Sequence, residues 1–175
     1  MCGIAAQFAY RPAAPPVARS SLLAVREAMA ARGPDGAGLW LSDDGRVGLA
    51  HRRLAIIDLS DQGAQPMARS GRDGRVHVSY NGEIYNFREL RAAMEAQGER
   101  FATQSDTEVL LALYAREGDG FVARLRGMFA FVLWDEGQRR MLLARDPFGI
   151  KPLYYADGGG AQRAASSVKA LLAGG

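Results

Sequence analysis

The chain opens with Met1-Cys2-Gly3-Ile4-Ala5-Ala6-Gln7-Phe8-Ala9-Tyr10, and Cys2 is its only cysteine. The segment from Ile4 to Tyr10 predicts a short buried strand, so a core strand begins directly after the thiol. If Met1 is removed, Cys2 carries its thiol beside a free α-amine. The reference pKa of the amine is about 7.7–8.0 and that of the thiol about 8.5, so unprotonated amine can accept the thiol proton. This stretch therefore predicts a nucleophile and its base in one residue.

The bulk composition is that of an ordinary globular protein. The 175 residues are 48% apolar and 23% charged, which predicts one domain spanning residues 1–175. No apolar run approaches the roughly 20 residues of a membrane span, and the start lacks the pattern of a signal peptide. One cysteine allows no internal disulfide, so a cytoplasmic location is expected. We therefore expect no membrane partner.

Charge and metal-ligand patterns exclude two further classes of function. The net charge of +3 comes from scattered arginines rather than a basic block with aromatic residues, so nucleic-acid binding is not expected. His51, His77 and the lone cysteine show no metal-ligand spacing, so no metal site is expected. A Cys2–His51 catalytic pair is less favoured than a packed, hydrogen-bonded histidine, because the α-amine already fills the role of base.

Strand signals outnumber helix signals along the chain. Strands are predicted at residues 4–10, 39–41, 47–52, 75–80, 128–134, 141–144 and 153–156, and helices at 20–31, 86–97, 105–117 and 167–173. Most neighbouring elements are joined by tight turns, which favours antiparallel pairing. Several strands are apolar on both faces, as in two stacked sheets with helices outside. The pattern therefore predicts an α+β fold.

Three further positions carry groups suited to attack on an amide. Asn81-Gly82 is predicted to end a strand, either as a plain turn or as a side-chain amide and a backbone N–H that converge on one oxygen. Arg53 can hold a carboxylate with two parallel hydrogen bonds, and Asp106 can hold an ammonium group. Each has a plain alternative: a solvated arginine, and an acid favoured at a helix start.

Several segments together resemble one family over nearly the whole chain, from Met1 to about Leu172. Similar to the glutaminase domain of asparagine synthetases are Met1-Cys2-Gly3-Ile4-Ala5, Arg32-Gly33-Pro34-Asp35-Gly36-Ala37-Gly38, Leu49-Ala50-His51-Arg52-Arg53-Leu54-Ala55-Ile56-Ile57-Asp58, Gln65-Pro66-Met67, Tyr80-Asn81-Gly82-Glu83-Ile84-Tyr85-Asn86, Ser105-Asp106-Thr107-Glu108, Gly127-Met128-Phe129-Ala130-Phe131 and Arg145-Asp146-Pro147-Phe148-Gly149-Ile150-Lys151-Pro152-Leu153-Tyr154-Tyr155.

The resemblance implies a class II glutamine amidotransferase domain with the N-terminal-nucleophile hydrolase fold, a four-layer αββα sandwich of two antiparallel sheets. It implies hydrolysis of L-glutamine to L-glutamate and ammonia through a γ-glutamyl thioester on Cys2. By the family's pattern, Asn81 and Gly82 form the oxyanion hole. The same pattern assigns the binding of glutamine to Arg53 for the α-carboxylate, Asp106 and Glu83 for the α-amine, and backbone groups of Leu54, Ala55, Ile56 and Ile57.

The partners follow from the same resemblance. The Ser-Gly-Gly-x-Asp-Ser run of the family's synthetase domain is absent, so that domain is expected to be missing from this stretch. No cofactor is expected in the glutaminase domain, because ATP and magnesium belong to the synthetase domain. The expected partners are L-glutamine and a synthetase domain or subunit that accepts ammonia.

Other interpretations stay open from the sequence. A related amidotransferase that acts on a dipeptide, a secondary metabolite or a sugar phosphate shares the same chemistry at Cys2. A non-catalytic interaction module of the same fold would keep Met1, and a redox-sensing thiol would change binding rather than hydrolysis.

Overall fold

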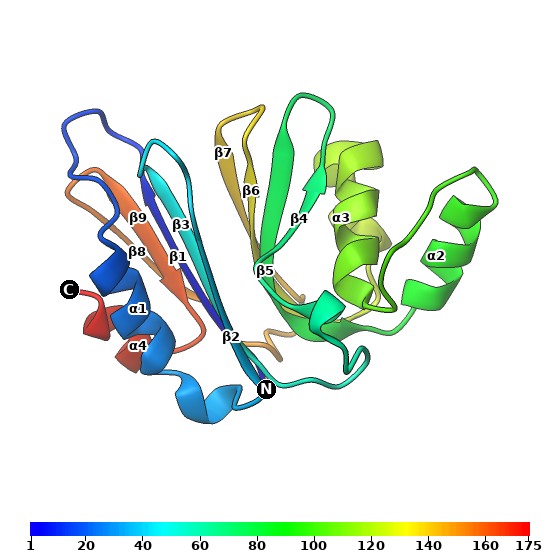
Figure 1. Cartoon of the computed structure of the whole chain (residues 1–175), viewed down its shortest axis with the longest axis horizontal. Helices are drawn as coiled ribbons and strands as arrows, with labels where there is room; N and C mark the ends of the chain where they lie inside the picture. Colours follow the sequence, from blue (N-terminus) through cyan, green and yellow to red (C-terminus); the bar gives the residue numbers. More distant parts are fainter.

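Two antiparallel sheets lie face to face in a computed structural model that describes residues 1–175 (Figure 1). The first sheet has the strand order β2-β3-β1-β9-β8, with bounds Gly36–Leu41, Val47–Arg53, Gly3–Ala9, Ala161–Ala165 and Tyr154–Gly158. The second has the order β4-β5-β6-β7, with bounds Met67–Ser70, Arg75–Ile84, Gly127–Asp135 and Arg140–Arg145. All neighbouring strands in both sheets are antiparallel, as the sequence predicts.

Helices cover the outer face of each sheet and complete four layers (Figure 1). Helices α1 (Arg19–Glu27) and α4 (Val168–Ala173) lie against the five-stranded sheet. Helix α3 (Asp106–Glu117) lies against the four-stranded sheet, and α2 (Phe87–Glu95) lies outside it. Short 3-10 turns occupy Ala30–Arg32, Asp61–Gly63 and Gly118–Arg124. The predicted four-layer αββα sandwich is confirmed.

Strand β1 shows why a sheet in this fold needs apolar residues on both faces. Ile4 and Ala6 belong to the cluster between the sheets, where they meet Val132 and Trp134 of β6. The intervening Ala5 belongs to a second cluster under α1 and α4. Successive side chains of a strand point to opposite faces of the sheet. Because both faces are buried here, the strand lacks the alternating polar residues of a sheet with one exposed face. A third cluster fills the space between the second sheet and the helices α2 and α3.

The predicted end of a strand at Asn81-Gly82 is wrong. Strand β5 continues to Ile84, and within it Asn81 lies opposite Ala130 and Gly82 opposite Phe129. Pairing with β6 along its full length satisfies backbone groups that a turn would leave unpaired, so the tertiary ladder overrides the local preference of Asn-Gly. The structure thereby places both residues inside a rigid sheet rather than on a loop.

The sequence also missed two short strands, β4 and β9. Strand β9 reads Ala-Gln-Arg-Ala-Ala, which carries no β-branched or aromatic residue. It forms because it fills the space between β1 and β8 and pairs with both. The loop predicted across residues 32–38 likewise ends early, because β2 already begins at Gly36.

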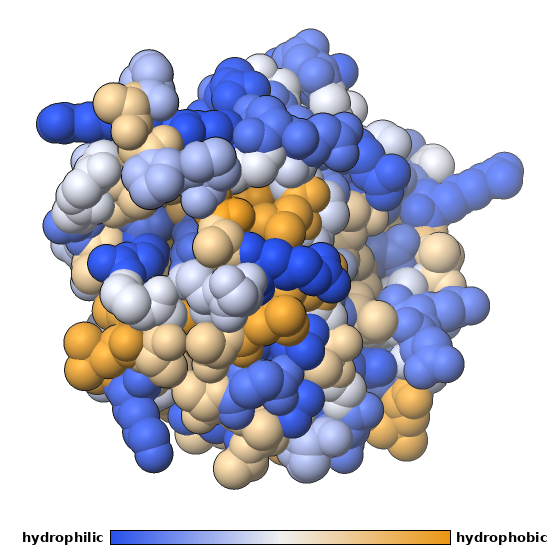
Figure 2. Space-filling view, turned by 60° about the vertical axis from the view of Figure 1, so that its left-hand side comes forward, coloured by the Kyte–Doolittle hydropathy of each residue, from blue (hydrophilic) through white to orange (hydrophobic).

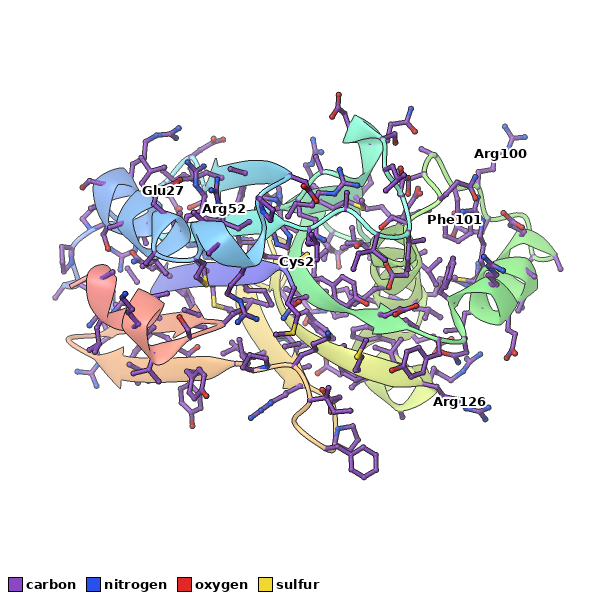
Figure 3. All side chains as sticks on the ribbon, turned by 90° about the horizontal axis from the view of Figure 1, so that it is seen from below. Cys2, Glu27, Arg52, Arg100, Phe101 and Arg126 are labelled. Atoms are coloured by element: carbon purple, nitrogen blue, oxygen red, sulfur yellow. The ribbon has the colours of Figure 1, made fainter.

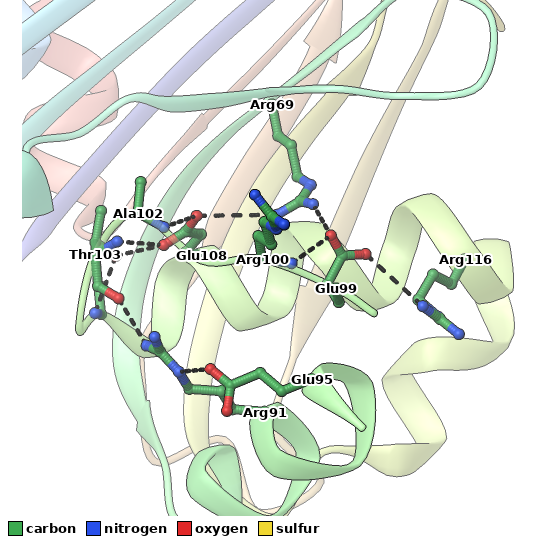
Figure 4. Close-up of polar contacts among 10 residues, drawn as sticks. Arg69, Arg91, Glu95, Glu99, Arg100, Ala102, Thr103, Glu108 and Arg116 are labelled. Carbon is green, nitrogen blue, oxygen red and sulfur yellow. Dashed lines mark hydrogen bonds and ion pairs between the residues drawn. The ribbon is translucent and has the colours of Figure 1, made fainter. Parts of the chain in front are cut away.

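Polar side chains fix the layer that holds α2 and α3 (Figure 4). Glu99 forms ion pairs with Arg69 and with Arg116, the latter at 3.7 Å. Ser105 caps α3 by accepting from the Thr107 N–H at 3.1 Å. Glu108 accepts from the backbone N–H groups of residues 102 and 103 and so fixes the segment that leads into α3.

The surface on the side of α1 and α4 carries small apolar patches separated by polar side chains (Figure 2). No helix has both the length and the apolar character needed to cross a membrane.

Candidate active site

A cavity of about 120 Å³ opens where the chain enters β1, between the ends of the two sheets. Seen from below, Cys2 lies midway along the molecule, far from the end marked by Arg100, Phe101 and Arg126 (Figure 3), and Figure 1 shows the N-terminus at the lower edge, between the two sheets. Eighteen residues line the cavity: Met1, Cys2, Arg53, Leu54, Ile56, Ile57, Asp58, Gly63, Gln65, Tyr80, Asn81, Gly82, Glu83, Ser105, Asp106, Thr107, Met128 and Lys151.

Cys2 is held by backbone contacts on both sides. Its Sγ lies 3.4 Å from the Leu54 nitrogen, which donates to it, and 3.6 Å from the Leu54 carbonyl oxygen. The Nε of Arg32 donates to the Cys2 carbonyl at 3.1 Å. Burial raises the pKa of the thiol, while the Leu54 contact, the N-terminal charge and Arg53 act in the opposite direction. The thiol therefore needs a nearby base to become a nucleophile at neutral pH.

Asn81 lines the cavity and carries a buried hydrogen-bond donor without a partner. Its side chain is 2% exposed, and its Nδ2 has no hydrogen-bond partner in the protein. Buried donors without partners are rare, so this one is suited to an oxygen of a bound ligand. The adjacent Gly82 lets the strand run close to β6, because a Cβ here would lie 2.4 Å from the Met128 carbonyl oxygen.

Asp106 stands at the first turn of α3 and faces the cavity from the second sheet's side. Its Oδ2 accepts from the Tyr80 hydroxyl at 2.6 Å and from the Ile84 N–H at 3.1 Å. Burial raises the pKa of this carboxyl group, and the bonds from Tyr80 and Ile84 counteract part of that rise. The fixed carboxylate can hold an ammonium group in the cavity.

Arg53 ends β3 and fixes the loop that follows it. Its guanidinium donates to the carbonyl oxygens of Asp58 and Ser60, the latter at 2.8 Å. Gly63 permits this approach, since a Cβ there would lie 2.4 Å from Nη2. A guanidinium has five N–H donors, so these two contacts leave others for a carboxylate ligand.

The structure gathers the residues singled out from the sequence into this one cavity, with one exception. Ala55 does not line it, and its N–H donates to Asp35 Oδ2 at 2.9 Å. The sequence predicted no role in the site for Arg32, Tyr80 or Lys151, although all three stand in the motifs that carry the family resemblance. Their contribution to the site depends on contacts between segments far apart in the chain, and sequence motifs do not show such contacts.

Neither histidine lies in the cavity. His51 is fully buried, with Nδ1 3.0 Å from Ser79 Oγ, and the Ser79 hydroxyl donates to the Ala50 carbonyl at 3.0 Å. Nδ1 of His51 therefore carries the proton of a neutral ring. Burial lowers the pKa of His51 to about 3. The structure contains no group of three or more His, Cys, Asp or Glu side chains that could hold a metal ion.

We expect His51 to make the fold sensitive to mild acid. Its pKa is about 3 when folded, against an ordinary value of 6.5, so between these values only the unfolded chain takes up the proton. Stability is therefore full above pH 6.5 and falls as the pH falls, by about 1.4 kcal/mol per pH unit. Denaturant unfolding between about pH 6.5 and 5 measures this slope.

A matched pair of variants isolates the cause of that slope. His51→Gln should flatten the slope of unfolding free energy against pH. His77→Gln should leave the part of that slope caused by His51 unchanged. An unchanged slope in His51→Gln would contradict the assignment.

Comparisons with known proteins agree with the fold. A family model described as a glutamine amidotransferase domain matches residues 1–175. The chain is 44% identical over 156 residues to "Asparagine synthetase [glutamine-hydrolyzing] 1" of Bacillus subtilis, which covers 89% of this chain and 24% of that protein. It is 44% identical over 145 residues to "Amidase chry2" of Gibberella zeae, covering 83% of this chain and 21% of that protein.

A solved structure shows the same fold at lower identity. The glutamine phosphoribosylpyrophosphate amidotransferase of B. subtilis has a TM-score of 0.83 and 24% identity, covering 99% of this chain and 43% of that one. The chain thus spans about a quarter of the length of the curated relatives it matches, with 21% for the amidase and 24% for the synthetase.

Proposed function

The chain belongs to the glutamine amidotransferase domain family, and from this premise we propose that it hydrolyses L-glutamine to L-glutamate and ammonia at Cys2. One observation carries the proposal: Cys2 lines the same cavity as Asn81, whose Nδ2 has no hydrogen-bond partner in the protein. A donor without a partner beside a nucleophile is the arrangement that acyl transfer requires.

The first half-reaction forms a thioester. Removal of Met1 frees the α-amine of Cys2, which takes the thiol proton as Sγ attacks the side-chain amide carbon. The carbonyl oxygen becomes an oxyanion that receives hydrogen bonds from Asn81 Nδ2 and the Gly82 N–H. The C–N bond then breaks, and the new ammonium of Cys2 returns its proton to the leaving nitrogen, which departs as ammonia.

The second half-reaction restores the enzyme. The free α-amine takes a proton from water as the water oxygen attacks the thioester carbon. The same oxyanion hole stabilises the second tetrahedral intermediate. The C–S bond breaks, the proton passes to the sulfur, and glutamate leaves with a new γ-carboxyl group.

Charged groups select a free amino acid as the substrate. We propose that Arg53 holds the α-carboxylate and that Asp106 and Glu83 hold the α-ammonium group, all three of which line the cavity. Backbone groups of Leu54, Ile56 and Ile57 are proposed to line the rest of the same pocket.

Ammonia is proposed to pass to a synthetase domain or subunit, for asparagine synthesis or a related amidation. This follows from the relatives, of which this chain covers about a quarter. We propose that the glutaminase reaction needs no cofactor, and that ATP and magnesium serve the synthetase partner. A cytoplasmic location is proposed because the lone cysteine must stay reduced to react.

The direct test measures glutamate and ammonia released from free L-glutamine by the protein with Met1 removed. Equal amounts of the two products are expected. Absence of both from a folded protein whose Cys2 amine is free would refute the proposed hydrolysis.

Glutamine inside a peptide is expected to be a poor substrate, because it lacks both the free carboxylate and the free ammonium group. Each charged hydrogen bond contributes about 1.5–3 kcal/mol, so kcat/KM should fall by at least about 10²-fold. Comparing free glutamine with an N-acetylated glutamine amide measures this difference. Cleavage of both at similar rates would remove the roles proposed for Arg53 and Asp106.

A further inference from the structure

Lys151 is a positively charged residue whose side chain has no partner in the protein. It lines the same cavity as Cys2, and the residue as a whole is only 7% exposed. Only its main chain is bonded: its N–H donates to Asp146, and its carbonyl accepts from Arg145. Its ammonium group makes no hydrogen bond or ion pair. An ammonium group without a counter-ion, placed in a confined cavity, attracts a ligand of opposite charge.

The carboxylate nearest in sequence is fully used by backbone groups. Asp146 Oδ1 accepts from the N–H groups of Phe148 and Ile150 at 3.1 and 3.0 Å. Asp146 Oδ2 accepts from Phe129 at 3.2 Å and from Lys151 at 3.0 Å. Asp146 therefore shapes the turn and does not neutralise the lysine side chain.

These same bonds fix Lys151 relative to the proposed oxyanion hole. Phe129, whose N–H binds Asp146, is the strand partner of Gly82 on β5. Arg145 Nε donates to the Lys151 carbonyl at 2.8 Å and holds the turn from its other side. The lysine backbone is thus bonded to the turn that is anchored beside Gly82.

The acids that line the cavity make other contacts. Asp58 accepts from Ser60 and from the Gln104 N–H, and Asp106 accepts from Tyr80 and Ile84. Glu83 is the third acid in the lining, and it forms no ion pair with the lysine. The positive charge of Lys151 is therefore available to an anionic ligand.

We infer that Lys151 is a further binding residue, whose ammonium group attracts negative charge on the γ-oxygens of the bound amino acid. The inference rests on the proposed function. The γ-amide of glutamine is neutral, whereas the tetrahedral intermediates and the γ-carboxylate of glutamate are anionic. Lys151 therefore strengthens binding of the product and stabilises the intermediates, with little effect on binding of glutamine.

A charge-removing variant and a charge-keeping variant test this inference. Lys151→Met should weaken glutamate binding by at least about 10-fold, the loss of one charged hydrogen bond, and lower kcat by a similar factor. Its affinity for glutamine should change by less than about threefold. Lys151→Arg should restore much of the glutamate affinity. Lys169→Met removes the chain's only other lysine, which is exposed on α4, and should behave as wild type.

Binding is measured by calorimetry in a Cys2→Ala background, where glutamine is not consumed. Unchanged glutamate affinity in Lys151→Met, or equal losses for glutamate and glutamine, would overturn the inference. Wild-type protein that releases no glutamate from glutamine would instead refute the proposed function. The glutamate titrations would still test whether Lys151 binds the γ-carboxylate.

A measurement on the unaltered side chain guards against a variant that does not fold. Protein labelled with ¹³C and ¹⁵N in lysine should show two side-chain signals, which Lys169→Met assigns. Saturating glutamate should shift the Lys151 signal more than glutamine does, and should leave the Lys169 signal in place. Equal shifts with the two amino acids would contradict the inference.

Discussion

Cys2→Ala should lower the rate of glutamate release by about 10⁴-fold or more while the protein stays folded. The substitution removes the only atom that can form the thioester, and loss of a nucleophile has effects of this size in other acyl-transfer enzymes. The thiol forms hydrogen bonds only with the Leu54 backbone, at 3.4 and 3.6 Å, so little stability depends on it. Steady-state assays with free glutamine measure the rate, and thermal unfolding checks the fold.

Blocking the α-amine of Cys2 while keeping its thiol provides the matched control, because this amine is proposed as the base. Intact-mass measurement should find the active protein lighter by one methionine. A form with extra residues ahead of Met1 should be folded and nearly inactive, and cleavage of that extension to expose Cys2 should restore the rate. Full activity with the amine blocked would show that another group deprotonates the thiol.

Asn81→Ala should lower kcat by about 10²–10³-fold and change KM for glutamine by only a few-fold. Asn81 Nδ2 has no partner in the free protein, so its hydrogen bond forms with the bound ligand. The oxyanion carries more charge than the ground-state carbonyl, so losing this hydrogen bond destabilises the transition state more than the bound substrate. Steady-state kinetics separates kcat from KM.

The chain's other asparagine gives the control. Asn86 lies outside the cavity, and its amide bonds to Arg124 and Arg126 instead. Asn86→Ala should therefore keep the wild-type kcat, although the loss of these contacts should lower the unfolding temperature. A rise in KM with unchanged kcat in Asn81→Ala would show that Asn81 binds the ground state and does not stabilise an oxyanion.

The layered fold could be predicted because the apolar composition of its strands indicates which of their faces are buried. The segment from Ile4 is apolar on both faces, and the structure buries both, one against β6 and one under α1 and α4. Strand β9 could not be predicted, since its Ala-Gln-Arg-Ala-Ala sequence has no strand preference of its own. Its pairing with β1 and β8 supplies the stability that its side chains lack.

For the candidate site, the sequence by itself determined the chemical groups: a thiol at Cys2, an amide at Asn81 and the charges of Arg53 and Asp106. Only the tertiary structure decided that Asn81 lies within a strand with an unpartnered Nδ2, and that Lys151 lines the cavity without a counter-ion. The physical reason is that residue type fixes what a side chain can donate or accept. Which partners reach it depends on contacts between segments far apart in the chain, and these form only when the two sheets pack.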